Sequence, residues 1–132
     1  MYTPDSQEIL KTIIEESHTP IALYVGRELI VTVANAAMIK AWGKDAGVIG
    51  KPLSEAVPEL DGQPFLDILQ KQFDTGELYE AREAPVALAS GSERRLFYFD
   101  FTYKPLKNNT GEVWAILNNA SDCTELVEAR RK

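Results

Sequence analysis

The side chains that could carry out nucleophilic or metal chemistry are few in this sequence and lie far apart along it. The sequence has one cysteine, Cys123, and one histidine, His18. A cysteine nucleophile needs a partner base, and a zinc site needs several thiolate or imidazole ligands. We therefore expect no catalytic role for Cys123 and no metal site. His18 precedes Thr19 and Pro20, so it is expected to end a helix, where an imidazole meets the helix dipole.

Other catalytic patterns have no better support. The sequence contains no glycine-rich dinucleotide or phosphate loop and no GxSxG elbow. Glu15 with Glu16, and Glu80 with Glu83, lie in polar stretches, where carboxylates are usually solvated rather than used as an acid–base pair. The residues themselves therefore favour a chain that is not an enzyme.

Charge and hydropathy restrict the partners. Twenty acidic and 14 basic side chains give a net charge of −6, which repels phosphate backbones and anionic lipid headgroups. The chain begins without a secretory signal pattern, has no apolar run long enough to span a membrane, and has a single cysteine, which suits a reducing compartment. We expect a cytoplasmic protein with no nucleic-acid partner and no direct membrane contact.

The 132 residues suit one domain, and its first part predicts a helix followed by a hairpin. Asp5 with Glu8 forms a capping box, and the helix it starts is expected to end before Pro20. Two short apolar runs, 21–25 and 29–34, then read as strands joined by a tight turn. The helix carries an apolar stripe made of Ile9, Leu10, Ile13 and Ile14.

The middle of the chain predicts helices. Asn35 can cap a short helix over 36–42, whereas 43–58 is rich in glycine and proline and allows only short turns. A longer helix opens near Pro64 and is ended by Gly76. Its apolar face is formed by Phe65, Leu66, Leu69 and Phe73.

Three more strands are predicted at 78–88, 95–104 and 112–120. This order of elements indicates an α+β fold, in which a five-stranded antiparallel sheet has its helices on one face. Side chains alternate between the two faces of the 95–104 strand. One face carries Phe97, Phe99, Phe101 and Tyr103. The other face carries Leu96, Tyr98, Asp100 and Thr102.

Both faces of the 112–120 strand are partly apolar, so the sheet needs cover on both sides. The internal helices can cover one face, and the N-terminal helix or a second copy of the chain can cover the other, which predicts a homodimer.

Asp122 with Glu125 forms a second capping box, followed by Arg130, Arg131 and Lys132. A helix is thus expected to begin here and to continue into a longer parent protein.

Four segments together resemble the PAS domain family, in particular the cytoplasmic sensor domains that precede bacterial histidine kinases. They are Val33-Ala34-Asn35-Ala36-Ala37, Val48-Ile49-Gly50-Lys51-Pro52-Leu53, the hairpin from Lys104-Pro105 to Gly111-Glu112, and Ser121-Asp122-Cys123-Thr124-Glu125. The last segment looks like the family's Asp-x-Thr exit motif. The resemblance implies the PAS fold, with a flanking helix over 1–19, the core over 20–121 and an exit segment over 122–132.

The resemblance also implies a site. Asp122 and Thr124 would couple the sheet to an outgoing signalling helix. An internal ligand pocket would be lined by Phe65, Leu69, Phe73, Phe97, Phe99, Phe101, Tyr103, Ile116 and Asn118, with hydrogen bonds from Tyr103 or Asn118 to the guest. Alternatively, these aromatic side chains fill the interior and leave no cavity.

Known cofactors of the family do not fit. The flavin-binding branch has a cysteine shortly after the position of Gly50, where this chain reads Lys51-Pro52-Leu53-Ser54. The haem-binding branch has a histidine on the helix that corresponds to 64–73, where this chain has none. We expect neither flavin nor haem, and any ligand is expected to be small and apolar or amphipathic.

The function expected from this resemblance is a noncatalytic sensor module. It would dimerise and relay a change in ligand or packing to a covalently linked transmitter domain, here a two-component histidine kinase. A small ketosteroid-isomerase-like enzyme or binding protein is the alternative, although the early hairpin opposes it and its one candidate carboxylate, Asp100, is predicted to face away from the pocket. A dimer spacer without any ligand also remains open.

Overall fold

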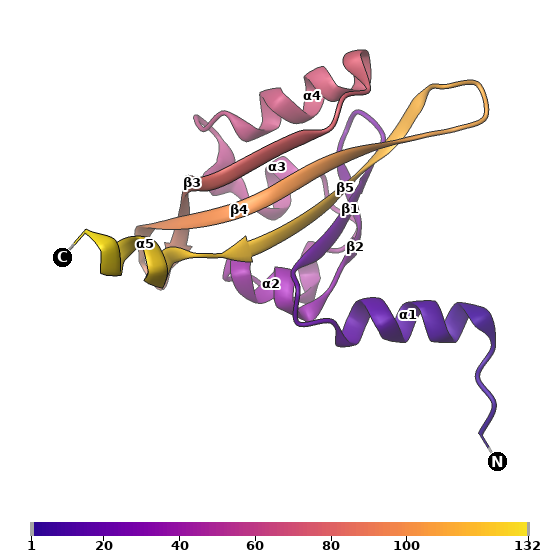
Figure 1. Cartoon of the computed structure of the whole chain (residues 1–132), viewed down its shortest axis with the longest axis horizontal. Coiled ribbons are helices and arrows are strands. Elements are labelled where there is room, and N and C mark those ends of the chain that lie inside the picture. The colour runs from indigo at the N-terminus through magenta and orange to yellow at the C-terminus, as the bar shows by residue number, and fades with distance from the viewer. Residues whose placement is uncertain (1, 132) are drawn as a thin grey trace.

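The computed structural model describes residues 2–131 and contains one five-stranded antiparallel sheet, as expected for the α+β class. The order of the strands across the sheet is β2-β1-β5-β4-β3, so the two halves of the chain meet where β1 pairs with β5 (Figure 1). The strands are β1 (Ile21–Val25), β2 (Ile30–Ala34), β3 (Tyr79–Ser90), β4 (Glu93–Lys107) and β5 (Val113–Asp122).

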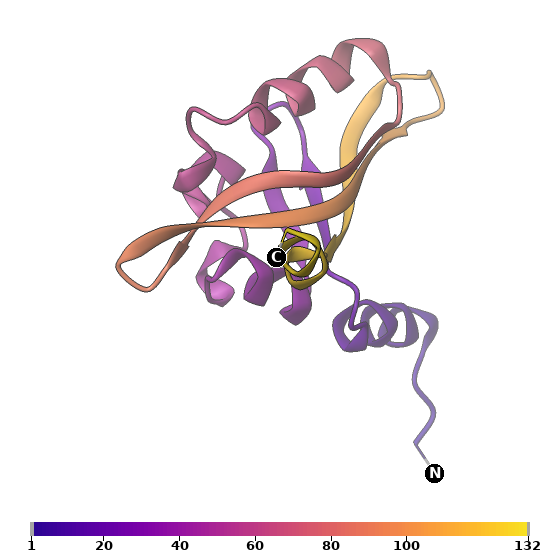
Figure 2. The ribbon, with the colours of Figure 1, turned by 60° about the vertical axis from the view of Figure 1, so that its left-hand side comes forward.

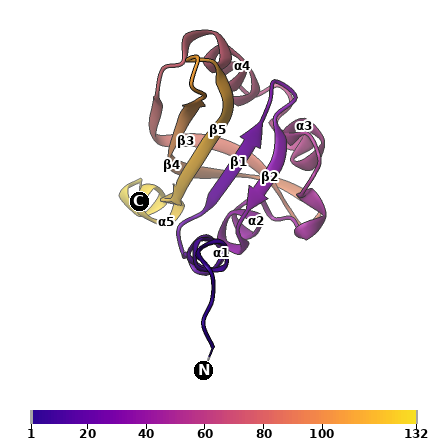
Figure 3. The ribbon, with the colours of Figure 1, turned by 90° about the vertical axis from the view of Figure 1, so that its right-hand side faces the viewer.

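The helical segments between β2 and β3 cover one side of this sheet, and Figure 3 shows α2 and α3 beside β2 with α4 above them. The α-helices are α1 (Ser6–Glu16), α2 (Ala36–Trp42), α3 (Leu53–Ala56), α4 (Phe65–Thr75) and α5 (Thr124–Arg130), with 3-10 turns η1 (Ala46–Val48) and η2 (Pro58–Leu60). Within residues 2–131, none of these helices has the length and apolar character needed to cross a bilayer.

The predicted caps start and end the helices. Asp5 Oδ1 accepts the N–H of Glu8 at 2.9 Å, and Asn35 Oδ1 accepts the N–H of Met38 at 3.0 Å. Gly76 ends α4 with φ +66°, in the left-handed conformation that glycine adopts without steric cost. These local signals therefore correctly predicted the starts of α1 and α2 and the end of α4.

Several strand limits differ from the prediction. β2 begins at Ile30 rather than Leu29, because Leu29 has a φ of +56° and still belongs to the turn after β1. β3, β4 and β5 are longer than predicted, since they pair with one another beyond the apolar runs from which they were recognised. The extension of β5 carries it to Asp122, the start of the expected exit segment.

Loop segments and side chains cover both edges of the sheet. Beside β2, the Val31 N–H donates to Lys51 O at 2.9 Å. Beside β3, the Ala87 N–H donates to Gln63 Oε1 and the Ala89 N–H donates to Glu59 Oε2, both at 2.9 Å. Because these bonds occupy edge groups that would otherwise be free, they tie the helical segment 43–64 to the two outer strands.

The core lies between the sheet and α2, α3 and α4. Phe99, Phe101 and Tyr103 are buried on the side that faces these helices, as alternation predicted. Phe97 is only partly buried, and Trp114 is 44% exposed. Neither of these two aromatic side chains is fully covered in the fold.

The N-terminal helix α1 stands away from the sheet, as Figures 1 and 2 both show. None of its residues is buried, and the apolar stripe includes Leu10 and Ile13, which are 61% and 62% exposed. Hence α1 does not cover the outer face of its own sheet. The N-terminal helix was one of the two covers expected for that face, the other being a second copy of the chain. Part of that outer face, around Tyr98, is covered by α5 instead.

Candidate functional site

A small cavity lies between the sheet and the helical layer. Its volume is about 50 Å³. At roughly 10–15 Å³ for each water, this is room for about four waters, whereas sites for drug-sized ligands measure about 300–1,000 Å³. Its wall is formed by Tyr24, Met38, Ala41, Trp42, Leu53, Leu60, Phe65, Val86, Leu88, Phe99, Phe101, Tyr103, Asn118 and Ala120.

One end of the cavity is polar. The Tyr24 hydroxyl donates to Asn118 Oδ1 at 2.7 Å, and Asn118 Nδ2 donates to the carbonyl oxygen of Thr102 at 3.1 Å. Burial raises the pKa of Tyr24 well above its ordinary value, so the phenol stays protonated and remains a donor. The Tyr24–Asn118 bond thus joins β1 to β5 inside the core.

Tyr103 lies beside this pair, because it is the register partner of Asn118 on β4. The helix α4 is attached at the same level, since Gln72 Nε2 donates to the Tyr103 carbonyl at 2.8 Å and to the Glu77 carbonyl at 2.9 Å. Gln72 Oε1 is buried and has no hydrogen-bond partner among residues 2–131. The Tyr103 backbone therefore joins α4 to the sheet.

The structure brings some of the expected pocket residues to this cavity and keeps others apart from it. Those that line it are Phe65, Phe99, Phe101, Tyr103 and Asn118. Leu69 and Ile116 are fully buried in the surrounding core without lining it, whereas Phe73 and Phe97 are only partly buried. The Phe73 ring lies under the Arg27 guanidinium at 5.4 Å, and the Phe97 ring lies under that of Arg95 at 4.9 Å.

Several cavity residues were not recognised in the sequence. Tyr24 and Trp42 stack with ring centroids 6.5 Å apart and form one wall. Tyr24 could have been found, because it alternates with its neighbours in the short β1 strand. The positions of Met38, Leu53, Leu60, Val86 and Leu88 depend on how the short helical turns fold onto β3, for which the sequence has no local signal.

The exit segment is attached to the outer side of β4. Thr124 Oγ1 accepts the N–H of Tyr98 at 2.9 Å, and the Cys123 N–H donates to the Tyr98 carbonyl at 2.9 Å. Asp122 Oδ1 in turn accepts the Thr124 N–H at 2.8 Å. The capping box predicted for Asp122 with Glu125 is therefore not formed: the N-cap of α5 is Cys123, which makes no side-chain cap bond, and α5 begins at Thr124. Together these bonds hold the start of α5 against Tyr98.

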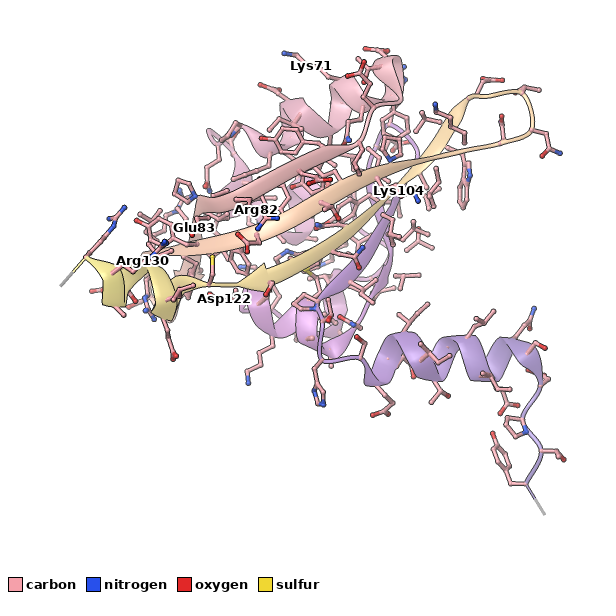
Figure 4. All side chains as sticks on the ribbon, viewed as in Figure 1. Lys71, Arg82, Glu83, Lys104, Asp122 and Arg130 are labelled. Atoms are coloured by element: carbon pink, nitrogen blue, oxygen red, sulfur yellow. The ribbon has the colours of Figure 1, made fainter. Side chains whose placement is uncertain are left out.

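Side chains of α5 add further contacts with the sheet. Val127 is buried, and the Arg131 guanidinium lies 5.1 Å from the centre of the Tyr98 ring. Arg130 pairs with Glu83 of β3, and Figure 4 shows these two side chains near Asp122. Exposed ion pairs such as this one contribute little to stability, so Thr124 and Val127 are the main attachments of α5.

Two residues considered for chemistry lie on this outer side. The Asp100 carboxylate accepts the N–H of Glu83 at 2.8 Å and does not line the cavity, so it is placed as the sequence predicted. Burial, followed by the nearby Asp100 carboxylate, raises the pKa of the Cys123 thiol, which disfavours the reactive thiolate. Within residues 2–131, no cluster of side chains suited to binding a metal occurs.

Solved structures of several signalling proteins share this fold. An RNA-binding light-oxygen-voltage receptor matches with a TM-score of 0.73 and 18% identity over 98% of this chain, which spans 38% of that receptor's chain. The PAS domain of BvgS from Bordetella pertussis matches with a TM-score of 0.69 and 23% identity, over 97% of this chain and 93% of that one.

A third similar structure is a domain of the putative light and redox sensing histidine kinase from Haloarcula marismortui. Its TM-score is 0.64 at 15% identity, over 89% of this chain and 99% of that domain. At these identities the likeness shows the fold alone. The family model described as the PAS fold matches residues 16–128, from the end of α1 into α5. The chain therefore belongs to the PAS family.

Proposed function

We propose that this chain is a noncatalytic, cytoplasmic sensor module that dimerises and relays a change in its cavity to a transmitter domain linked after α5. The observation that carries the proposal is the position of Tyr98. Its backbone N–H and carbonyl hold Thr124 and Cys123 of the exit segment, while the next residue along β4, Phe99, lines the cavity. The residue that lines the cavity and the residue that holds the output helix are therefore neighbours in β4.

The physical basis of the relay is the alternation of a strand. Phe99 points toward the helices and Tyr98 toward α5, so a shift of the Phe99 ring moves the peptide that holds Thr124. A ligand or a change of packing acts by stabilising one of two arrangements of α5. It can shift their populations only by the difference in its affinity for them.

Dimerisation is supported by α1. Its stripe is exposed on a helix that no other part of residues 2–131 covers, and a second copy offers the same stripe. Likeness to a domain of a histidine kinase supports a kinase as the linked transmitter. The charge of −6 supports neither nucleic acid nor an anionic membrane as a direct partner.

The small cavity also favours a second candidate function, a dimer spacer without a ligand. A volume of about 50 Å³ is compatible with an interior that packing alone nearly fills. In that case changes in the cavity would not reach α5. The two functions therefore differ in whether Phe99 and α5 are coupled.

The test compares two core substitutions by amide hydrogen exchange. Phe99→Leu alters the cavity wall beside Tyr98, whereas Val31→Ala alters a fully buried residue of β2, across the sheet from α5. We expect Phe99→Leu to change protection at Thr124–Arg130 by about fivefold more than its change in global stability explains. Val31→Ala should change exchange there only through global stability.

Equal effects of the two substitutions on α5, once corrected for global stability, would contradict the relay and favour the spacer. The correction comes from urea unfolding of each variant. A change at α5 in the Phe99→Leu variant that exceeds what its global stability explains supports the relay.

A further inference from the structure

The outer strand β3 contains a residue in an unusual backbone conformation. Glu83 has a φ of +50°, in the left-handed region, and a bulge interrupts the pairing of β3 with β4 between Ala81 and Ala84. A residue with a side chain adopts this region at a cost, so it persists only where neighbouring groups hold it. Leu29, which also has a positive φ, lies in the tight turn after β1, whereas Glu83 lies within a strand. The conformation of Glu83 therefore needs another cause than a turn.

Asp100 of β4 holds this conformation. Its Oδ1 accepts the Glu83 N–H at 2.8 Å, which gives the bulged residue a partner that the interrupted ladder does not supply. A bond from an amide to a carboxylate is among the stronger hydrogen bonds. The same oxygen lies 3.9 Å from Cys123 Sγ, so the Asp100 side chain also meets the exit segment.

The bulge lies directly behind the wall of the cavity. The strand pairs on either side of it join Ala81 to Phe101 and Ala84 to Phe99, and both of these aromatic residues line the cavity. Asp100 is the residue between them, and alternation places its carboxylate on the outer face. The group that holds the bulge is therefore fixed between two residues of the cavity wall.

On the outer face, the bulge brings the Glu83 side chain to α5. Bulges re-aim the side chains that they carry, and Glu83 pairs with Arg130 in the last turn of α5. Figure 4 shows both side chains at the same end of the sheet. Thr124 holds the first turn of α5 through the Tyr98 N–H. An exposed ion pair adds little stability, but with the first turn fixed it selects the direction of the helix.

We infer that Asp100 positions the exit helix. By holding Glu83 in the left-handed conformation, Asp100 fixes the bulge from which Glu83 reaches Arg130, and it thereby sets the direction in which α5 leaves the sheet. The inference rests on the proposed function in that it names a further positioning residue for the proposed output. Its path runs through β3 and does not pass through Tyr98.

The substitutions Asp100→Ala and Asp100→Asn form the test, since only asparagine keeps an oxygen that can accept the Glu83 N–H. The bulge is followed by the NOE between the amide and α protons of Glu83, which is strongest at positive φ. We expect Asp100→Ala to weaken this NOE and to raise amide exchange at Ala129 and Arg130 about threefold, the size of one exposed ion pair. Asp100→Asn should resemble the unmodified chain. Thr102→Ala, at the next outward-facing position of β4, is the matched control and should change neither signal.

Two further variants separate positioning from a general loss of stability. Glycine adopts a positive φ without steric cost, so Asp100→Ala should destabilise the Glu83→Gly chain less than the unmodified chain in urea unfolding. Glu83→Gln keeps the backbone bond to Asp100 and removes only the charge. It should therefore raise exchange at Arg130 as Asp100→Ala does, while the Glu83 NOE stays strong in kind at the glutamine.

Two results would overturn the inference. An unchanged Glu83 NOE in the Asp100→Ala variant would show that Asp100 does not hold the bulge. Unchanged exchange at Ala129 and Arg130 in both Asp100→Ala and Glu83→Gln would show that the bulge does not position α5. Neither result depends on Phe99, so the relay from the cavity can fail in the Phe99→Leu comparison while Asp100 still positions α5.

Discussion

The two helices that flank the sheet, α1 and α5, differ in what holds them. The longer helix, α1, has a side-chain cap and an apolar stripe, yet none of its residues is buried. α5 has seven residues, and Thr124 and Val127 are both buried against the sheet. Capping and periodicity thus determine where a helix forms, whereas its docking depends on groups in the sheet that can pair with it.

This difference fits two roles. α5 is held by the backbone of Tyr98, as the proposed relay from the sheet to α5 requires. The link from α1 to the core is polar and lies at its end, where Asn35 Nδ2 donates to the carbonyl oxygens of Ile14 at 3.0 Å and Thr19 at 2.8 Å. The apolar stripe of α1 therefore remains available to a second copy of the chain.

The largest expected loss of stability comes from the junction that α1 shares with the core. Asn35 is 2% exposed and also accepts the N–H groups of Ile21 and Met38, both at 3.0 Å. Asn35→Ala would leave these buried groups unpaired and lower the free energy of unfolding by about 3 kcal/mol in urea titrations. Asn35→Ser keeps a capping oxygen and should lose less. A loss below about 1 kcal/mol for Asn35→Ala would show that Asn35 does not hold the junction.

An intermediate effect is expected where α5 joins the sheet. Thr124→Val keeps the shape of the side chain but leaves the buried N–H of Tyr98 without its acceptor, at a cost of about 2 kcal/mol. Urea unfolding measures this loss, and faster amide exchange at Tyr98 locates it. Thr124→Ser retains the hydroxyl and is the control. If the valine and serine variants behave alike, the Thr124 hydroxyl is not what holds α5.

The smallest change in stability is expected for the α1 stripe. Ile13→Glu places a charge on an exposed apolar position and should alter the free energy of unfolding by less than about 0.5 kcal/mol. Sedimentation velocity should nevertheless show loss of the dimer. Thr12→Glu adds the same charge outside the stripe, about 100° around α1 from Ile13, and should leave the proposed dimer intact. Dissociation by both variants, or by neither, would contradict dimerisation through this stripe.

The predictable parts of the fold were those encoded within a few residues. Asp5 and Asn35 cap the helices that follow them, and alternation along β4 placed Phe99 and Tyr103 toward the helices. Phe97 obeys the same alternation but is only partly buried, because the number of helices covering a strand end is a tertiary property. A strand pattern predicts the face of a side chain and not the extent of its cover.

Contacts between distant parts of the chain were not predictable. Tyr24 and Asn118 are 94 residues apart, and their hydrogen bond depends on the pairing of β1 with β5. The bond from the Tyr98 N–H to Thr124 depends in the same way on where β5 ends. Sequence predicted a role for Thr124 through family resemblance, and the sheet topology supplies the physical reason for its position.

The central claim is that α5 is docked on its own sheet whereas α1 is completed by a second copy. Amide hydrogen exchange of the unmodified chain, measured at a low and a high protein concentration, tests it directly. The account predicts that protection at Thr124–Arg130 is the same at both concentrations, and that protection at Ser6–Glu16 rises only at the high one. Protection of α1 in the dilute monomer, or protection of α5 that appears only with concentration, would contradict it.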